Sequence, residues 1–178
     1  YYHNGISWVP AATALAGWSL TGNSFLDPAV HFLGTTDTSA IRFRVNNEPS
    51  GIISYHGRNT SLGNKSLFFN TGEDNTALGE SAMFSNSSGN QNVAVGNSAL
   101  AGNIRGADNT AIGYQALNQD TVSENTAVGA WAMYENRSGG ANVAMGNSAL
   151  ANNKWGSDNT AIGFQALLND TVSENTAV

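Results

Sequence analysis

A short motif recurs along most of this chain and constrains its fold more than any other feature. The pattern Asn-(Thr/Val)-Ala-aliphatic-Gly, or a close variant, begins at Asn59, Asn75, Asn92, Asn109, Asn125, Asn142, Asn159 and Asn175. Successive starts are separated by 16 or 17 positions, so the interval is almost constant. A fixed short period is typical of a solenoid, in which each coil packs only against its neighbours. The sequence therefore predicts a long, stiff array with one coil for each motif.

The motif is also part of a larger repeat. Residues 75–124 and 125–174 align without gaps and are identical at 34 of 50 positions. The unit that duplicated therefore comprises three coils, of which the third is shorter than the other two by a single position. The chain begins at Tyr1 and stops at Val178, partway through another coil, so we expect these residues to be an ordered piece of a longer protein.

Composition argues against several classes of function. The net charge is −6 and only 11% of residues are charged, so the clustered Lys and Arg that bind phosphate are missing and nucleic acid is not an expected partner. The chain has no Cys, which excludes disulfides and thiolate chemistry. The sequence has no apolar run long enough to span a bilayer, so membrane insertion is not expected.

The repeat favours short strands over helices. Asn, Gly, Ser and Thr recur every few residues, and these are weak helix formers. One strand is predicted over Thr110–Gly113, and a second over Gln115–Leu117. The segments 103–108 and 119–124 are predicted to form the looser return of the coil. The Asn that begins each motif is predicted to stack on its equivalents as a ladder of amides.

Alternation along the predicted strand separates two rows of side chains. Neighbouring residues of a strand point to opposite faces, so the motif Ala and the aliphatic residue after it cannot face the same side. Small Ala suits the narrow interior of a short coil, which places the aliphatic residues outside; the reverse arrangement would put the Ala row outside. The aliphatic row comprises Leu78, Val95, Ile112, Val128, Met145 and Ile162. A long exposed apolar row is unusual on a soluble monomer, so we expect copies of the chain to associate along it.

The residues before the array are predicted to form a small β-rich collar over residues 1–58, followed by the solenoid over residues 59–178. Asn4-Gly5 between aromatic residues is a signal for a type I′ hairpin turn. Ile41–Val45 alternates apolar and cationic residues, Asn46-Asn47 is a turn, and Gly51–Tyr55 is predicted to be a further strand. Such a collar would cover the open edge of the first coil.

The segment N-T-A-I-G-Y-Q-A-L at Asn109–Leu117 resembles the head repeat of trimeric autotransporter adhesins, and also repeats in tail-fibre-like proteins. Residues 1–9, 17–23, 27–28, 32–37 and 41–47 look like segments that precede such repeats in tail-fibre-like proteins. The resemblance implies an all-β fold, a left-handed parallel β-roll in which three chains lie side by side. It also implies that the aliphatic row lies at the seam of a homotrimer.

Residues with catalytic or metal-binding potential are few. His3, His31 and His56 lack metal-ligand spacing. The loop Asp-Thr-Val-Ser-Glu occurs twice, with Asp120 paired with Glu124 in the first copy and an identical pair in the second. Paired carboxylates can hold calcium or perform acid–base chemistry. Duplication alone accounts for this recurrence, so we interpret the loop as solvated and expect no catalytic residues, cofactor or metal.

Aromatic residues that vary between copies or lie in loops are the better candidates for contact with a partner. They are Trp131, Trp155, Tyr114, Tyr134 and Phe164. Exposed aromatic side chains on a repetitive scaffold can stack on sugar rings or on protein surfaces. The alternative for Tyr114 and Phe164, which occupy equivalent positions, is packing at a seam between chains.

These observations favour a structural or adhesive fibre segment over an enzyme. We expect an extracellular homotrimeric rod, on a phage tail, an injection machine or a bacterial surface, that presents or contributes to binding of a cell-surface glycan or protein receptor. A second hypothesis is an ice- or surface-binding solenoid, because Thr recurs in register, although Val93 and Val143 interrupt that row. A third is a glycan-degrading, tailspike-like β-helix, which would require a cluster of carboxylates in a groove.

Overall fold

The computed structural model describes residues 2–3, 8–9 and 33–178, which belong to two compact units, Tyr1–Thr36 and Asp37–Val178. In the first unit, β1 (Tyr2–His3) pairs antiparallel with β2 (Trp8–Val9), with His3 opposite Trp8. The type I′ turn predicted at Asn4-Gly5 falls on residues whose structure is not described. Residues 4–7 themselves and the segment 10–32 lie outside the described residues.

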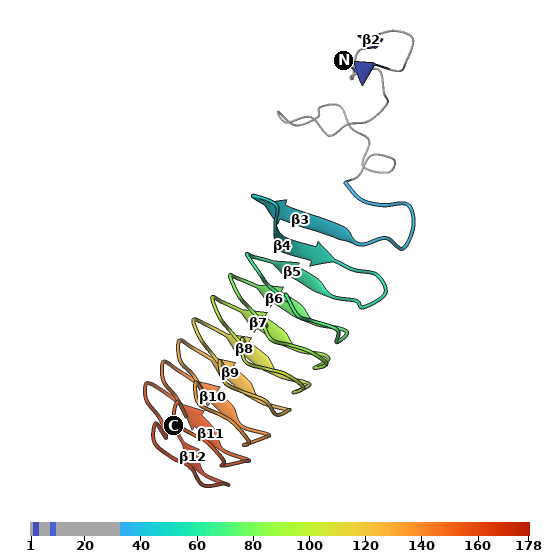
Figure 1. Ribbon diagram of the computed structural model, residues 1–178. Coiled ribbons are helices and arrows are strands. Elements are labelled where there is room, and N and C mark those ends of the chain that lie inside the picture. The colour runs from blue at the N-terminus through green and yellow to red at the C-terminus, as the bar shows by residue number, and fades with distance from the viewer. Residues whose placement is uncertain (1, 4–7, 10–32) are drawn as a thin grey trace. The chain divides into compact units, whose positions relative to one another are not determined.

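The second unit contains one continuous sheet (Figure 1), and its ten strands follow one another in chain order. The strands are β3 (Ile41–Val45), β4 (Glu48–Ile53), β5 (Thr60–Leu62), β6 (Thr76–Leu78), β7 (Val93–Val95), β8 (Thr110–Ile112), β9 (Thr126–Val128), β10 (Val143–Met145), β11 (Thr160–Ile162) and β12 (Thr176–Ala177). From β5 to β12 every neighbouring pair is parallel, which gives seven complete coils. The predicted all-β parallel solenoid is confirmed.

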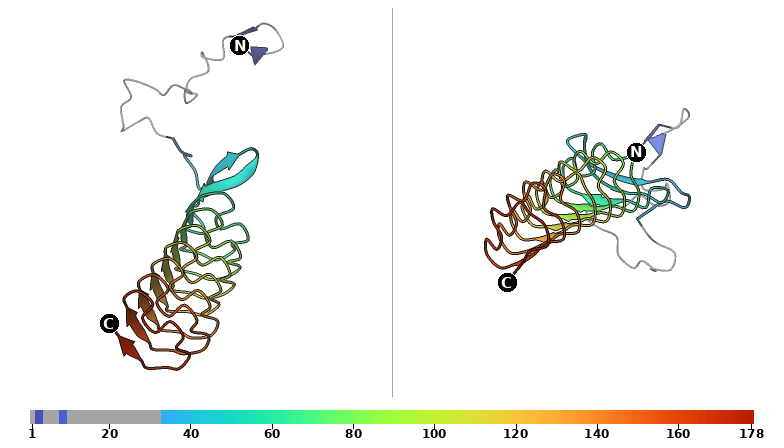
Figure 2. Two further views of the ribbon diagram at one scale, coloured as in Figure 1. Left: turned by 90° about the vertical axis from the view of Figure 1, so that its left-hand side faces the viewer. Right: turned by 90° about the horizontal axis from the view of Figure 1, so that it is seen from below.

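Each coil contributes a single strand, not two. The strand ends one residue before the motif glycine, and the predicted second strand at Gln115–Leu117 is wrong because this segment is a turn. Gln115 and Leu117 both adopt left-handed backbone angles, with φ of 54° and 48°. Strands require negative φ, and these two residues instead bend the chain around the corner of the coil. Figure 2 shows the strands along one side of the stacked coils and the turns around the rest.

The strands stack with equivalent motif residues opposite one another. Ala111 lies opposite Ala94 on one side and Ala127 on the other, although the coils differ in length. The extra residue of the longer coils is absorbed in the return segment. In a longer coil the amide of Gly106 donates to Asn103 Oδ1 at 2.8 Å, three residues back. In a shorter coil the amide of Val122 donates to Asp120 Oδ1 at 3.2 Å, two residues back.

The interior of the array is narrow and filled by small and medium side chains. Within the solenoid, the motif alanines from Ala77 to Ala161 are completely buried, which confirms that the Ala row faces inward and the aliphatic row outward. In the five coils that begin at Asn75 to Asn142, a second buried Ala and a buried Leu or Met follow, exemplified by Ala116 and Leu117. The contiguous hydrophobic core therefore runs the length of the array as stacked rows of like residues.

The asparagines that begin the motifs form the predicted ladder. The backbone amide of Asn109 donates to Asn92 Oδ1 at 3.0 Å, and the side-chain amide of Asn92 donates to Asn75 Oδ1 at 3.1 Å and to the Gly106 carbonyl at 2.9 Å. Each buried amide therefore satisfies backbone groups on its own coil and on the next one. This ladder gives the polar part of the interior the hydrogen bonds that burial requires.

A hairpin continues the sheet at the N-terminal end of the array. Asn46 and Asn47 join β3 to β4 with φ of 49° and 59°, the left-handed pair of a type I′ turn, which confirms the predicted strand and turn. The following strand is Glu48–Ile53, earlier in the chain than the predicted Gly51–Tyr55. Strand β4 pairs antiparallel with β5 and so covers the edge of the first coil. The hairpin thus belongs to the same compact unit as the array.

Candidate functional site: the outer face of the sheet

The outer face of the parallel sheet is formed by the first and third residues of each strand, and it carries two rows. The Thr/Val row comprises Thr60, Thr76, Val93, Thr110, Thr126, Val143, Thr160 and Thr176. The aliphatic row comprises Leu62, Leu78, Val95, Ile112, Val128, Met145, Ile162 and Val178. The structure therefore places all six sequence-predicted seam residues side by side on one continuous surface.

The aliphatic row is substantially exposed in the single chain. Leu78 and Ile162 are each 39% exposed, Ile112 is 40% exposed and Met145 is 45% exposed, whereas Ala111 beside Ile112 is fully buried. The residues of the Thr/Val row are partly or well exposed as well. No member of either row is charged. An uncharged strip that recurs in every coil is larger than the isolated apolar residues that ordinary surfaces carry.

The repeat makes this surface regular. Parallel strands lie roughly 4.8 Å apart, and the two outward residues of one strand are separated by roughly 6.6 Å. The register pairs Ile112 with Val95 and with Val128, so each aliphatic side chain has a like neighbour on both sides. The aliphatic side chains therefore form one regularly spaced row.

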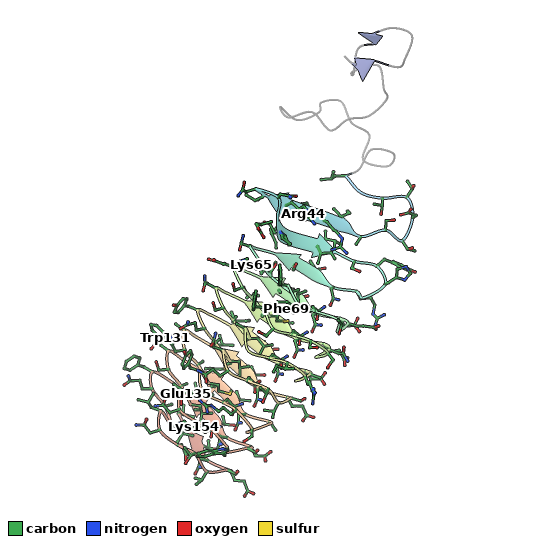
Figure 3. The ribbon with its side chains drawn as sticks, in the orientation of Figure 1. Arg44, Lys65, Phe69, Trp131, Glu135 and Lys154 are labelled. Atoms are coloured by element: carbon green, nitrogen blue, oxygen red, sulfur yellow. The ribbon has the colours of Figure 1, made fainter. Side chains whose placement is uncertain are left out.

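Two of the five candidate contact aromatics meet on the surface. The rings of Tyr114 and Trp131 are 5.5 Å apart at an angle of 89°, an edge-to-face arrangement. The indole Nε1 of Trp131 donates to Gln115 Oε1 at 2.9 Å, which fixes the ring against the preceding coil. Both rings remain close to half exposed. Figure 3 shows Trp131 at one margin of the stacked coils.

The other three aromatics do not join this pair. Trp155 and Phe164 are well exposed and Tyr134 is partly buried, and among the described residues none of the three makes a ring contact. Beside Tyr134, Glu135 forms an ion pair with Lys154 of the next coil at 3.3 Å (Figure 3). The aromatic candidates therefore form one local pair and three separate side chains.

The repeated carboxylates do not form a site. Asp120 is completely buried, so its interpretation as part of a solvated loop is wrong, whereas Glu124 is exposed. Desolvation raises the pKa of Asp120 to about 7, against the opposing effect of hydrogen bonds from Val122, Asn125 and Asn136. Within the described part of the chain, no three His, Asp or Glu residues come together as metal ligands.

Of the three histidines, the structure describes the side chain of His56 alone. His56 is exposed and its ring meets Tyr55 edge-on, at a centroid distance of 5.6 Å. His31 and the side chain of His3 lie outside the described residues.

A cavity that the sequence analysis did not predict lies at the N-terminal end of the array. It has a volume of about 560 Å³ and is lined by Arg42, His56, Ser61, Ser66 and Glu73, among others. Ser61 and Ser66 occupy the two alanine positions of the first coil, and Ser61 Oγ is buried without a hydrogen-bond partner. Serine at both alanine positions of the first coil is visible in the sequence, and it indicates that the N-terminal end of the core differs from its middle.

In the comparisons with protein-family models, curated proteins and solved structures, nothing matches the chain. Among the described residues there is no helix long and apolar enough to cross a membrane.

Proposed function

We propose that this chain is a structural and adhesive fibre segment, of the kind found in tail fibres and surface adhesins, that forms a rigid rod with two further copies of itself. The observation that carries the proposal is the outer face, with its two uncharged rows repeated in every coil from β5 to β12. The interior of the coil is already filled by Ala, Leu, Met and Asn, so the exposed aliphatic residues have no place inside the same chain.

A homotrimer gives these residues a partner. Three identical faces can meet around a threefold axis, and such a cyclic arrangement closes without leaving an exposed copy of the surface. The seam would bury Leu78, Val95, Ile112, Val128, Met145 and Ile162 of each chain. Leu78, Ile112, Met145 and Ile162 are 39–45% exposed, so burying each of these side chains contributes about 1 kcal/mol, and the contribution is repeated along the array.

The same architecture suits a rod that holds a binding surface away from its base. The hydrogen bonds of the Asn ladder and of the parallel sheet link every coil to the next, so bending the array would disturb many bonds at once. In this proposal the rod is extracellular, and exposed aromatics such as Trp131, Tyr114, Trp155 and Phe164 contribute contacts to a glycan or protein receptor. The proposal assigns no catalytic step to the chain.

The test is the molar mass in solution, measured by light scattering during size-exclusion chromatography. We expect three times the chain mass of 18.5 kDa. The double substitution Ile112→Asp and Val128→Asp places charges in the middle of the seam and should give monomers that retain the β-sheet circular dichroism signal. Val172→Asp, in an exposed return segment, is the matched control and should remain trimeric. A wild-type monomer at all accessible concentrations would overturn the proposal.

A second candidate is an ice- or surface-binding solenoid, and one specific observation favours it. Thr110 lies opposite Thr126, and Thr160 opposite Thr176, on the same outward face as the aliphatic row. In this case the regularly spaced Thr hydroxyl and methyl groups would contact an ordered surface such as ice, and the outer face would not bind two further copies of the chain. The decisive measurement is thermal hysteresis of the purified protein. Thermal hysteresis that is lost in Thr110→Lys would support this candidate. The absence of thermal hysteresis in the wild type would rule it out.

A further inference from the structure

A second buried row of side chains runs through the array, one residue from each complete coil. Its members lie eleven residues after the motif Asn: Asn70, Asn86, Asn103, Asp120, Asn136, Asn153 and Asp170. The members from Asn86 to Asn153 are fully buried. This set is called the amide row below, and it contains aspartate in place of asparagine in two of the coils.

Side-chain hydrogen bonds link the amide row from coil to coil. Asn86 Nδ2 donates to Asn70 Oδ1 at 2.6 Å, and Asn103 Nδ2 donates to Asn86 Oδ1 at 3.0 Å. Further along, Asn136 Nδ2 donates to Asp120 Oδ1 at 3.2 Å and Asn153 Nδ2 to Asn136 Oδ1 at 3.4 Å. In every link the later residue donates its amide to the oxygen of the earlier one.

Two pairs of neighbouring residues in the amide row lack this hydrogen bond, and in both pairs the later residue is an aspartate. They are Asn103 with Asp120 and Asn153 with Asp170. An ionised carboxylate has no proton to donate, so the row is interrupted where its pattern requires a donor.

The hydrogen bonds of Asp120 identify the carboxylate oxygen that lies where the missing hydrogen bond to Asn103 would form. Oδ1 accepts from the amide of Val122 at 3.2 Å and from Asn136 Nδ2 at 3.2 Å, which is the role that Oδ1 plays in the asparagines of the row. Oδ2 therefore occupies the place of the amide nitrogen, and the hydrogen bond that it accepts from Asn125 Nδ2 is long, at 3.5 Å.

No charged partner compensates for a negative charge at this point. The charged residues on the three coils concerned are Arg105 and Asp108 before it, Glu124 on its own coil, and Glu135 and Arg137 after it. None of these five side chains forms a hydrogen bond or ion pair with Asp120, and burial is the largest influence on its titration. A buried carboxyl without a counter-ion favours its neutral form.

We propose that Asp120 is a proton-operated link in the amide row: when neutral, its hydroxyl donates from Oδ2 to Asn103 Oδ1 and completes the row, and when ionised it leaves this step open. The joint between the coils 92–108 and 109–124 then tightens on protonation and loosens when the proton is lost. The device makes the stiffness of the rod depend on pH at one defined place.

The direction of the effect follows from the pKa of Asp120, raised to about 7 by burial from an ordinary value of 3.8. The folded chain holds this proton more tightly than the unfolded chain. The resulting stabilisation is complete below the unfolded pKa and is lost as the pH rises through the folded pKa, so the window lies between about 4 and 7. Within it the unfolding constant rises by up to about tenfold per pH unit.

The substitution Asp120→Asn tests the link, because it supplies a permanent donor of the same shape. Asparagine is compatible with a coil of the shorter kind, since Asn70 occupies this position in the coil 59–74. We expect the variant to be more stable than the wild type at pH 8, to match it at pH 4, and to lack the Asp120-dependent part of the pH profile. The control is Asp170→Asn, which should retain the wild-type profile because Asp170, in the last complete coil, is only partly buried. An unchanged profile in Asp120→Asn would overturn the proposal.

A second measurement needs no change at Asp120. Carbon NMR of the carboxyl group in the folded wild type should give a titration midpoint for Asp120 near neutral pH; a midpoint near the ordinary aspartate value of about 3.9 would overturn the proposal. In folded Asn103→Ala the neutral form loses its acceptor, so the midpoint of Asp120 should fall by a measurable fraction of a unit. A midpoint unaffected by this substitution would show that burial alone holds the proton and that the link does not form.

Discussion

Gly113 lies directly against the backbone carbonyl of Gly129 in the next coil, so that a Cβ atom on Gly113 would stand 2.5 Å from that oxygen. The same residue has a φ of 136°, which side-chain-bearing residues rarely adopt. This contact fixes the distance between coils at the corner where the strand ends.

Gly113→Ala should therefore be strongly destabilising. Unfavourable backbone angles cost about 1–3 kcal/mol, and the collision with Gly129 adds an overpacking cost of about 1–3 kcal/mol. The matched control is Gly163→Ala, because Gly163 has a similar φ of 129° but nothing within 4 Å of the added Cβ. Denaturant unfolding of both variants at one protein concentration should separate the two costs. Equal destabilisation would contradict the role of the coil-to-coil contact.

Asn92→Ala should show the contribution of the asparagine ladder. The substitution removes the acceptor of the Asn109 amide, at 3.0 Å, and the donor to the Gly106 carbonyl, at 2.9 Å, both in buried surroundings. Each buried group left without a partner costs about 1–3 kcal/mol. The exposed Asn97 of the same coil provides the control Asn97→Ala, for which we expect little change in unfolding free energy. Similar losses in the two variants would argue against the ladder.

Leu117→Ala should create a cavity in the middle of the core. Leu117 is fully buried and belongs to the stacked Leu/Met row, where coils above and below hold their own large residues and restrict collapse. Leu to Ala substitutions in such sites cost about 2–5 kcal/mol. Val172→Ala, at a residue that is 60% exposed, should change the unfolding free energy by less than about 0.5 kcal/mol. Calorimetric unfolding of the two variants distinguishes these outcomes.

Arg58→Ala should change the titration of Asp74 and have only a small effect on stability. Arg58 binds Asp74 Oδ2 through Nη2 at 2.6 Å, and this hydrogen bond, helped by charge, holds the pKa of Asp74 below its ordinary value. Such a carboxylate stabilises the fold above its unfolded pKa, and the contribution is lost as the pH falls through the folded pKa. Because the pair is exposed, solvent screens most of the energy.

The measurement for this pair is carboxyl-carbon NMR. The midpoint of Asp74 should rise towards the ordinary aspartate value in Arg58→Ala and rise less in Arg58→Lys, which keeps the charge but loses the planar fork. An unchanged midpoint in Arg58→Ala would show that the ion pair does not persist in solution.

Some features of the fold could be read from single residues because the repeat fixes them locally. The spacing from Asn109 to Asn125 gives the coil length, and alternation at Ala111 and Ile112 gives the inward and outward rows. Both arguments need only the geometry of one strand and the assumption that coils stack in register.

The backbone conformation at the corners of the coil could not be predicted from the local sequence. Gln115-Ala116-Leu117 alternates polar and apolar residues as a strand would, yet Gln115 and Leu117 are left-handed. A coil this short must turn several times, and closure of the coil imposes these angles against the local preference of the residues. The edge-to-face contact of Tyr114 with Trp131 likewise depends on how neighbouring corners stack.

Asp120 gives the clearest example of a feature that sequence patterns do not predict and the three-dimensional structure shows. The period, the register, the Asn ladder and the uncharged outer face could all be predicted from the sequence, because each follows from a residue type that recurs at a fixed spacing. The burial of Asp120, which accepts a hydrogen bond from Asn136, could be seen only in the three-dimensional structure, because its loop has the composition of a solvated segment. Burial of a loop residue is produced by the coils above and below it, and no pattern within a single coil contains that information.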